Sequence, residues 1–108
     1  MRHLQLTPEH VRQLQAIFEG AGIETARHRP VIFGSRTRGV ARPYSDVDVG
    51  IAGEPLTLGQ LDRVVEDLEE SDLPFRVEVV NLAGASPEFR QVAEASAVAL
   101  AEAAGLRP

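Results

Sequence analysis

Residues 31–51 read VIFGSRTRGVARPYSDVDVGI and decide the fold of this chain. The apolar run Val31–Phe33 ends at a Gly-Ser pair, and a second apolar run holds Asp46 and Asp48. Because alternate side chains of a strand lie on one face, the two aspartates share a face and the valines between and after them share the other. The stretch therefore predicts two short strands, the second of which presents a pair of carboxylates.

Asp46 and Asp48 are predicted to form a metal-dependent nucleotide site. Two carboxylates held on one strand repel each other unless a cation lies between them. Mg²⁺ takes oxygen ligands of this kind and usually keeps phosphate oxygens as further ligands. The alternative is an exposed strand start, where aspartates are common, so the Asp-x-Asp pattern needs support from its neighbours.

Two other sites are excluded by the spacing of this stretch. An EF-hand loop that starts at Asp46 would need glutamate at its twelfth position, where this chain has Thr57. A P-loop would need Lys-Ser or Lys-Thr after Gly34 and Gly39, and the chain continues instead with Val-Ala.

The spacing of the Gly-Ser pair and the aspartates resembles the signature of the polymerase-β-type nucleotidyltransferase superfamily. Gly34-Ser35 is followed after ten residues by Asp46-Val47-Asp48. The longer pattern FGSRTRG…SDVDVGI is similar to the smallest members, the minimal nucleotidyltransferases that are often paired with HEPN-domain proteins in prokaryotic toxin–antitoxin modules. The resemblance covers nearly the whole chain.

This resemblance implies a binding site for a nucleoside triphosphate at the Gly-Ser turn. Gly34 permits a tight backbone turn, and the hydroxyl of Ser35 can donate to a phosphate oxygen. Arg36 and Arg38 are the candidate phosphate contacts, because guanidinium groups match the geometry of phosphate oxygens. The alternative for each arginine is a surface residue that balances nearby acids.

The resemblance also implies that Asp46 and Asp48 hold two Mg²⁺ ions and that a later strand supplies a third carboxylate. Glu78 occupies the matching position, where the family usually has aspartate. The extra methylene moves the carboxylate by more than about 1 Å, a displacement to which catalysis can be sensitive. Glu78 is therefore expected to be a third metal ligand or a general base, with a surface glutamate as the alternative.

The whole chain of 108 residues is expected to be a single domain, residues 1–108. It has no cysteine, which excludes disulfides and thiolate chemistry, and its net charge of -5 argues against broad nucleic-acid binding. No apolar run approaches the length of a membrane span, and the N-terminus lacks a signal-peptide pattern. We therefore expect a cytoplasmic protein with no membrane partner.

The expected fold is α/β, with a small mixed β-sheet, packed helices and the order α-β-α-β-α-β-α. Cap residues and apolar periodicity predict a helix after Thr7, one after Thr57 and one from Ser86 towards Gly105, and a strand at Phe75–Asn81. The sheet arrangement comes from the resemblance to the polymerase-β-type nucleotidyltransferase fold. The last helix is alanine-rich and has apolar residues on more than one side, which suits either an oligomer surface or a helix packed in the core.

The expected function is Mg²⁺-dependent transfer of AMP from ATP to a hydroxyl acceptor. The resemblance implies that this acceptor belongs to a partner HEPN toxin and that the chain acts as its antitoxin. The chain has no separate region that could hold another acceptor. Because Glu78 replaces the usual aspartate, the alternative is an inactive antitoxin subunit that binds nucleotide and neutralises its partner by binding alone.

Overall fold

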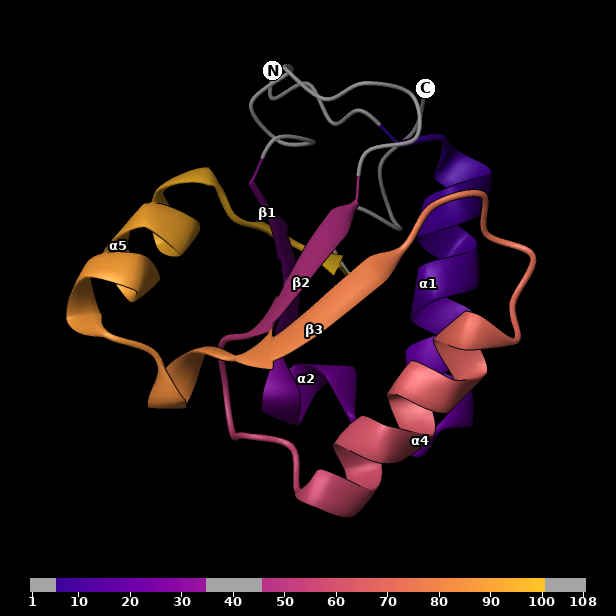
Figure 1. Ribbon diagram of the computed structural model, residues 1–108, viewed down its shortest axis with the longest axis horizontal. Coiled ribbons are helices and arrows are strands. Elements are labelled where there is room, and N and C mark those ends of the chain that lie inside the picture. Colours follow the sequence, from indigo (N-terminus) through magenta and orange to yellow (C-terminus); the bar gives the residue numbers. More distant parts are fainter. Residues whose placement is uncertain (1–5, 35–45, 101–108) are drawn as a thin grey trace.

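A computed structural model describes residues 6–34 and 46–100 of the chain. None of the described helices is both long enough and apolar enough to cross a membrane. The helices and strands, shown in Figure 1, are in chain order α1 (Pro8–Gly20), α2 (Thr25–His28), β1 (Pro30–Phe33), β2 (Val47–Ile51), α4 (Leu58–Glu69), β3 (Val77–Asn81), the 3-10 turn η1 (Leu82–Gly84), α5 (Pro87–Ser96) and β4 (Val98–Ala99).

The strands form one mixed sheet in the order β3-β2-β1-β4. β1 runs antiparallel to β2 on one side and to β4 on the other, whereas β2 and β3 are parallel. The predicted α/β class with a mixed sheet is thus confirmed. The sequence motif lies on the two central strands, so the sheet itself fixes the spacing between the end of β1 and the start of β2.

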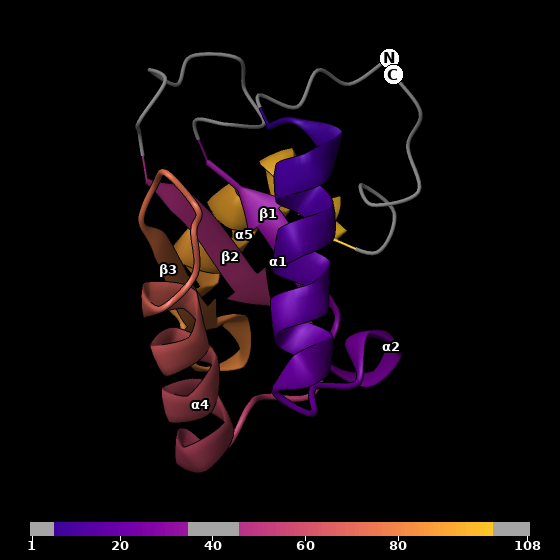
Figure 2. The same cartoon turned by 90° about the vertical axis from the view of Figure 1, so that its right-hand side faces the viewer.

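Helices α1 and α4 lie side by side on one face of the sheet (Figure 2). The valines of β2 point into this layer, as the alternation of the strand predicted, and they meet the buried stripe of each helix. Fully burying one large apolar side chain, such as Phe18 of α1, contributes roughly 1.5–3 kcal/mol. The main core consists of the buried residues Val11, Leu14, Phe18, Ile23, Ile32, Val47, Val49, Ile51, Leu56, Val64, Leu68, Phe75, Val98 and Leu100.

The opposite face of the sheet is covered by η1 and α5. A smaller buried cluster forms there from Val31 and Phe33 of β1, Leu82 of η1 and Ala93 of α5. Each of the two elements covers only part of this face: η1 contacts β2, and α5 contacts β1. Asp48 belongs to this face, because its strand partner Phe33 is part of the cluster.

The helix starts predicted from sequence are confirmed. The hydroxyls of Thr7, Thr57 and Ser86 accept hydrogen bonds from backbone N–H groups in the first turns of α1, α4 and α5, at 3.1, 3.1 and 3.2 Å. At α4 the side chain of Gln60 also accepts from the Thr57 N–H, which completes a capping box. Each helix therefore begins where its side-chain chemistry satisfies otherwise unpaired N–H groups.

The predicted last helix was too long. Instead of continuing towards Gly105, α5 ends at Ser96, and the chain then pairs as β4 with the free edge of β1. This pairing gives backbone hydrogen bonds to both strands and places the Val98 and Leu100 side chains in the main core. The edge of β1 thus overrides the helical preference of an alanine-rich stretch.

Three smaller differences concern the other elements. The third strand is shorter than the predicted Phe75–Asn81, because regular pairing begins only at Val77. The single turn α2 was not expected from the sequence. The expected helix between the first two strands falls in residues 35–45, which lie outside the described residues.

Candidate active site

Asp48 has one paired residue in each of the two strands that flank β2. Its strand partner in β1 is Phe33, and its partner in the parallel strand β3 is Glu78. Side chains at paired positions share a face, so the two carboxylates stand next to each other on the face that α5 partly covers. The fold therefore brings Asp48 and Glu78 together from segments that are thirty residues apart in sequence.

Gly34 closes this site at the end of β1. Its φ of +87° lies in the left-handed region that favours glycine, and a Cβ at this position would come within 2.8 Å of the Asp48 Oδ2 atom. The backbone N–H of Gly34 donates to the Ser96 Oγ atom at 3.2 Å. The glycine thus lets the backbone turn directly beside the carboxylate.

Like charges and burial both disfavour ionisation of Asp48. Partial burial raises the pKa of the Asp48 carboxyl above its ordinary value of 3.8, and the negative charges of Glu78 and Asp46 raise it further. Asp46 and Glu78 are themselves exposed. The three carboxylates therefore create a negative potential centred on Asp48, which a bound cation would relieve.

The donor set fits a hard divalent cation that takes its remaining ligands from the substrate. Within residues 6–34 and 46–100, no group of three or more histidine, cysteine, aspartate or glutamate side chains is arranged to hold a metal ion. Mg²⁺ is commonly bound by one or two carboxylates together with phosphate oxygens and water. Asp46 and Asp48 suit that arrangement, whereas Glu78 as a third metal ligand gains no support from the described residues and stays a prediction.

The same face of β2 is covered a short distance from Asp48. Two residues further along, Gly50 packs under Leu82 of η1, and a Cβ on Gly50 would meet the Leu82 side chain at 2.8 Å. Leu82 thereby closes the lower part of the sheet face. The sheet face over Gly50 is therefore closed to a ligand.

Three of the predicted nucleotide-binding residues cannot be placed. Ser35, Arg36 and Arg38 belong to residues 35–45, which lie outside the described residues. Of the predicted phosphate cradle, the structure therefore describes Gly34 alone. The positions of Gly34 and Asp46 place both ends of that segment at the same end of the sheet, next to Asp48.

Sequence reasoning missed the contribution of α5 to this site. Ser96 holds the Gly34 turn, and Phe89 packs edge-to-face against Phe33, with ring centroids 5.8 Å apart. Both residues lie on the face of α5 that carries the buried Ala93. The spacing of these residues marks them as the packed face of a helix, but no local pattern indicates that this face supports the Gly34 turn.

Comparison with known families identifies the class of protein. A family model described as "Polymerase beta, Nucleotidyltransferase" matches residues 13–104. The match covers most of the chain, including all three carboxylates and the Gly34 turn. The chain therefore belongs to the polymerase β nucleotidyltransferase family, and the resemblance drawn from its motif is confirmed.

One relative is similar over about half of the chain. It is a protein of Haemophilus influenzae named "Probable protein adenylyltransferase MntA", and it is 46% identical over 61 residues. The aligned region is 56% of this chain and 54% of the relative. The chain is thus matched to about half the length of that protein.

Proposed function

We propose that this protein is a nucleotidyltransferase that moves AMP from ATP to a hydroxyl group of a partner protein. The observation that carries the proposal is the position of Asp48, which stands beside Glu78 on the next strand and directly under the Gly34 turn. Family membership supports the reaction class. The choice of AMP and of a protein acceptor follows the name of the Haemophilus influenzae relative.

In the proposed reaction, the acceptor hydroxyl oxygen forms a bond to the α-phosphorus of ATP. The bond from that phosphorus to the oxygen bridging the α- and β-phosphates breaks, and pyrophosphate leaves with the electron pair. The hydroxyl proton passes to a nearby carboxylate, and we assign this role to Glu78 because it is exposed and lies beside Asp48. Such transfers depend mainly on positioning and charge stabilisation, which rigid strands provide.

Asp46 and Asp48 would hold Mg²⁺, which supplies charge neutralisation at the triphosphate and lowers the pKa of the acceptor hydroxyl. Asp48 is held in place by its strand, and the glycine at position 34 lets the backbone pass beside its Oδ2 atom. Arg36 and Arg38 are proposed to contact the phosphates from the segment that connects the two strands.

A protein acceptor suits what the described residues offer. The face beside Asp48 is bounded by Leu82 and α5. The described residues form the sheet and the helices packed on it, so an acceptor that brings its own binding surface would suit this site better than a free small molecule. We propose a HEPN-type toxin as this acceptor and an antitoxin role for the chain, following the family pattern of its motif.

A second candidate function is an inactive antitoxin that binds nucleotide and neutralises its partner by contact alone. It is favoured by a specific observation, because Glu78 occupies the position where the family usually carries aspartate and the described residues hold no group of three metal ligands. In that case Mg-ATP would bind, but no AMP would be transferred.

The deciding experiment is mass spectrometry of a HEPN-type partner after incubation with the protein and Mg-ATP. The proposed function predicts a partner that is heavier by one or more AMP units, and little product when the partner is omitted. Binding of Mg-ATP without any modified partner would favour the inactive antitoxin. Efficient transfer to a free small molecule, with an unmodified partner, would contradict the protein acceptor.

A further inference from the structure

The outer edge of β3 has backbone groups that the described sheet does not use. β3 is an edge strand, and the Val47 N–H donates to the Arg76 carbonyl at 2.8 Å. In a parallel ladder with Val47 opposite Val77, the residues that bond to β2 are those on either side of Val77 and Val79. The N–H and C=O groups of Val77 and Val79 therefore point outwards, away from the ladder that the described residues form.

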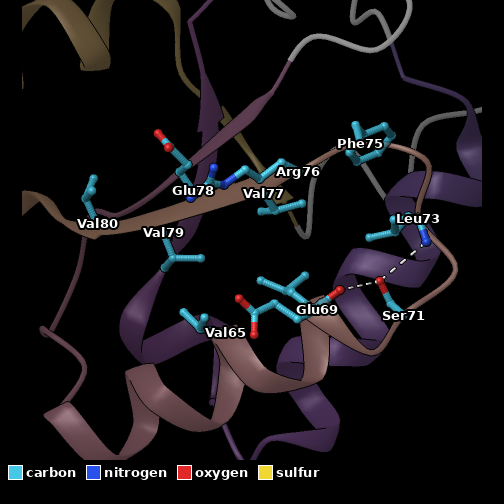
Figure 3. A pocket seen from close by; sticks show the side chains of 11 residues that line it. Val65, Glu69, Ser71, Leu73, Phe75, Arg76, Val77, Glu78, Val79 and Val80 are labelled. Carbon is cyan, nitrogen blue, oxygen red and sulfur yellow. Dashed lines mark hydrogen bonds between the residues drawn. The ribbon is translucent and has the colours of Figure 1, made fainter.

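A groove runs along this edge between β3 and α4. It has a volume of about 520 Å³, and Figure 3 shows Val77 and Val79 pointing from β3 towards α4, with Glu78 on the opposite side of the strand. Its α4 wall includes Val65, which is 36% exposed, and Glu69. An apolar groove next to outward-pointing strand groups suits a peptide that adds as a further strand.

The position of Glu78 connects this edge with the candidate active site. Paired positions run across the sheet from Phe33 to Asp48 to Glu78. A strand added beyond β3 would continue this row, with a side chain about 4.5–5.5 Å from Glu78. Because neighbouring strands lie about 4.8 Å apart, that side chain would also lie within two strand spacings of β2 and Asp48.

We propose that the β3 edge binds an extended segment of the acceptor protein as an added strand, and so presents the acceptor hydroxyl beside Glu78. This inference rests on the proposed function and adds the mode of partner binding. Alternate residues of the segment would be apolar and enter the groove against Val65 and Val79. The residue between them would carry the hydroxyl on the side of Glu78 and Asp48.

The charge around the groove favours a basic segment over a second copy of this chain. The exposed charged residues of α4 are acidic except for Arg63, and the groove is lined by two glutamates, Glu69 and Glu78, and one arginine, Arg76. Two copies joined at β3 would bring two acidic α4 helices together, whereas lysines flanking the acceptor would be attracted. The exposed acidic residues are Asp62, Glu66 and Glu69 on α4 and Glu70 at its C-cap.

The test uses a fluorescein-labelled peptide with the sequence Lys-Lys-Val-Tyr-Val-Lys-Lys. Its affinity is measured by anisotropy in the presence of Mg-ATP, for the full chain and its Val79→Pro variant. Proline removes the outward N–H of Val79, which the ladder to β2 does not need, so the fold should tolerate it. Val79→Thr is the matched control, because threonine keeps the N–H and the branched shape.

We expect Val79→Pro to weaken peptide binding at least tenfold. The peptide affinity of Val79→Thr, and the Mg-ATP affinity of both variants, should stay within about twofold of the wild type. A control peptide with proline in place of both valines should bind weakly, and its affinity should be the same for the wild type and for Val79→Pro. If Val79→Pro does not fold, Val65→Glu provides the second test, since a charge on the α4 wall should weaken peptide binding to a similar extent.

Each contrary outcome is distinct. Wild-type protein that binds Mg-ATP but not the peptide, or equal peptide affinity in wild type and Val79→Pro, would overturn the strand-addition proposal and leave the proposed function intact. A wild-type dimer that Val79→Pro converts to monomer would assign the edge to a second copy and also overturn it. Failure to bind Mg-ATP at all would instead contradict the proposed function.

Discussion

The backbone of Gly34 passes so close to the Asp48 carboxylate that a single added Cβ would lie 2.8 Å from the Oδ2 atom. Gly34 directly follows β1 and Asp48 lies in β2, and because these two strands pair antiparallel, the sheet sets the separation of the two residues. The turn residue and the acid of the motif are therefore one structural unit. A change at either position should be felt at the other.

Gly34→Ala should lower both stability and transfer. The positive φ of +87° alone costs an alanine about 1–2 kcal/mol, and the contact with Asp48 adds to this. Gly22→Ala is the matched control, because Gly22 has a φ of +82° but a Cβ there would meet no heavy atom within 4 Å. We expect similar backbone cost in both variants, measured by denaturant unfolding, and at least tenfold loss of transfer only in Gly34→Ala. Equal activity in the two variants would contradict the close packing of Gly34 on Asp48.

Asp48→Asn should abolish transfer while making the ligand-free protein as stable as the wild type or more stable, by up to about 1 kcal/mol. The raised pKa of Asp48 means that the folded chain binds its proton more tightly than the unfolded chain does. The stability attributable to this group is therefore lost as the pH rises from 3.8 through the raised pKa.

The stability difference between Asp48→Asn and wild type should consequently be larger at pH 7 than near pH 3.8. Urea unfolding at both pH values, without metal or nucleotide, measures it. A variant that is less stable than the wild type at pH 7 would indicate that Asp48 makes stabilising contacts that outweigh its repulsion from Glu78 and Asp46.

Glu78 substitutions separate the active enzyme from the inactive antitoxin. If Glu78 receives the acceptor proton, Glu78→Gln should reduce turnover by about 10²-fold or more, and Glu78→Asp should retain part of the activity. Neither change should destabilise the chain by more than about 0.5 kcal/mol, because the side chain is exposed. Initial rates of partner modification provide the measurement, and wild-type turnover in Glu78→Gln would remove the residue from the mechanism.

Ser96→Ala tests the support that α5 gives to the Gly34 turn. Loss of the hydroxyl that accepts from the Gly34 N–H should cost about 1 kcal/mol and should reduce transfer several-fold through misplacement of the turn. Ser86→Ala removes a capping hydroxyl from the same helix at a cost of about 1 kcal/mol. If Ser86→Ala lowers transfer as much as Ser96→Ala does, the effect comes from general destabilisation of α5 and not from the turn.

Much of this fold follows from local sequence patterns. Thr7, Thr57 and Ser86 cap helices because their hydroxyls satisfy nearby N–H groups, and this chemistry depends only on neighbouring residues. The alternation around Asp48 likewise predicts which face of β2 is apolar. These features needed no knowledge of distant contacts.

The features that sequence patterns missed depend on contacts between distant segments. Helix α5 ends at Ser96 because the edge of β1 pairs with Val98 and Ala99, and that edge exists only in the folded sheet. The bond between Gly34 and Ser96 joins residues that are 62 apart in sequence. Periodicity along one segment has no access to such partners.

The candidate site shows the same division. The motif predicted that Asp48 lies on the face of β2 opposite the valines, and it predicted the turn at Gly34. The pairing of Asp48 with Glu78 required the strand order of the family. The raised pKa of Asp48 depends on burial and on that neighbour, so no sequence pattern gives it. Ser35, Arg36 and Arg38 remain predictions of phosphate contact.

Nucleotide transfer can be distinguished from every other use of ATP by following the α- and γ-phosphates separately. The protein is incubated with Mg²⁺, its HEPN-type partner and ATP labelled at one position or the other. We expect the partner to acquire the α-label and the γ-label to be released as pyrophosphate, with neither product formed by Asp48→Asn. Transfer of the γ-label to the partner, or α-labelling that survives in Asp48→Asn, would contradict this expectation.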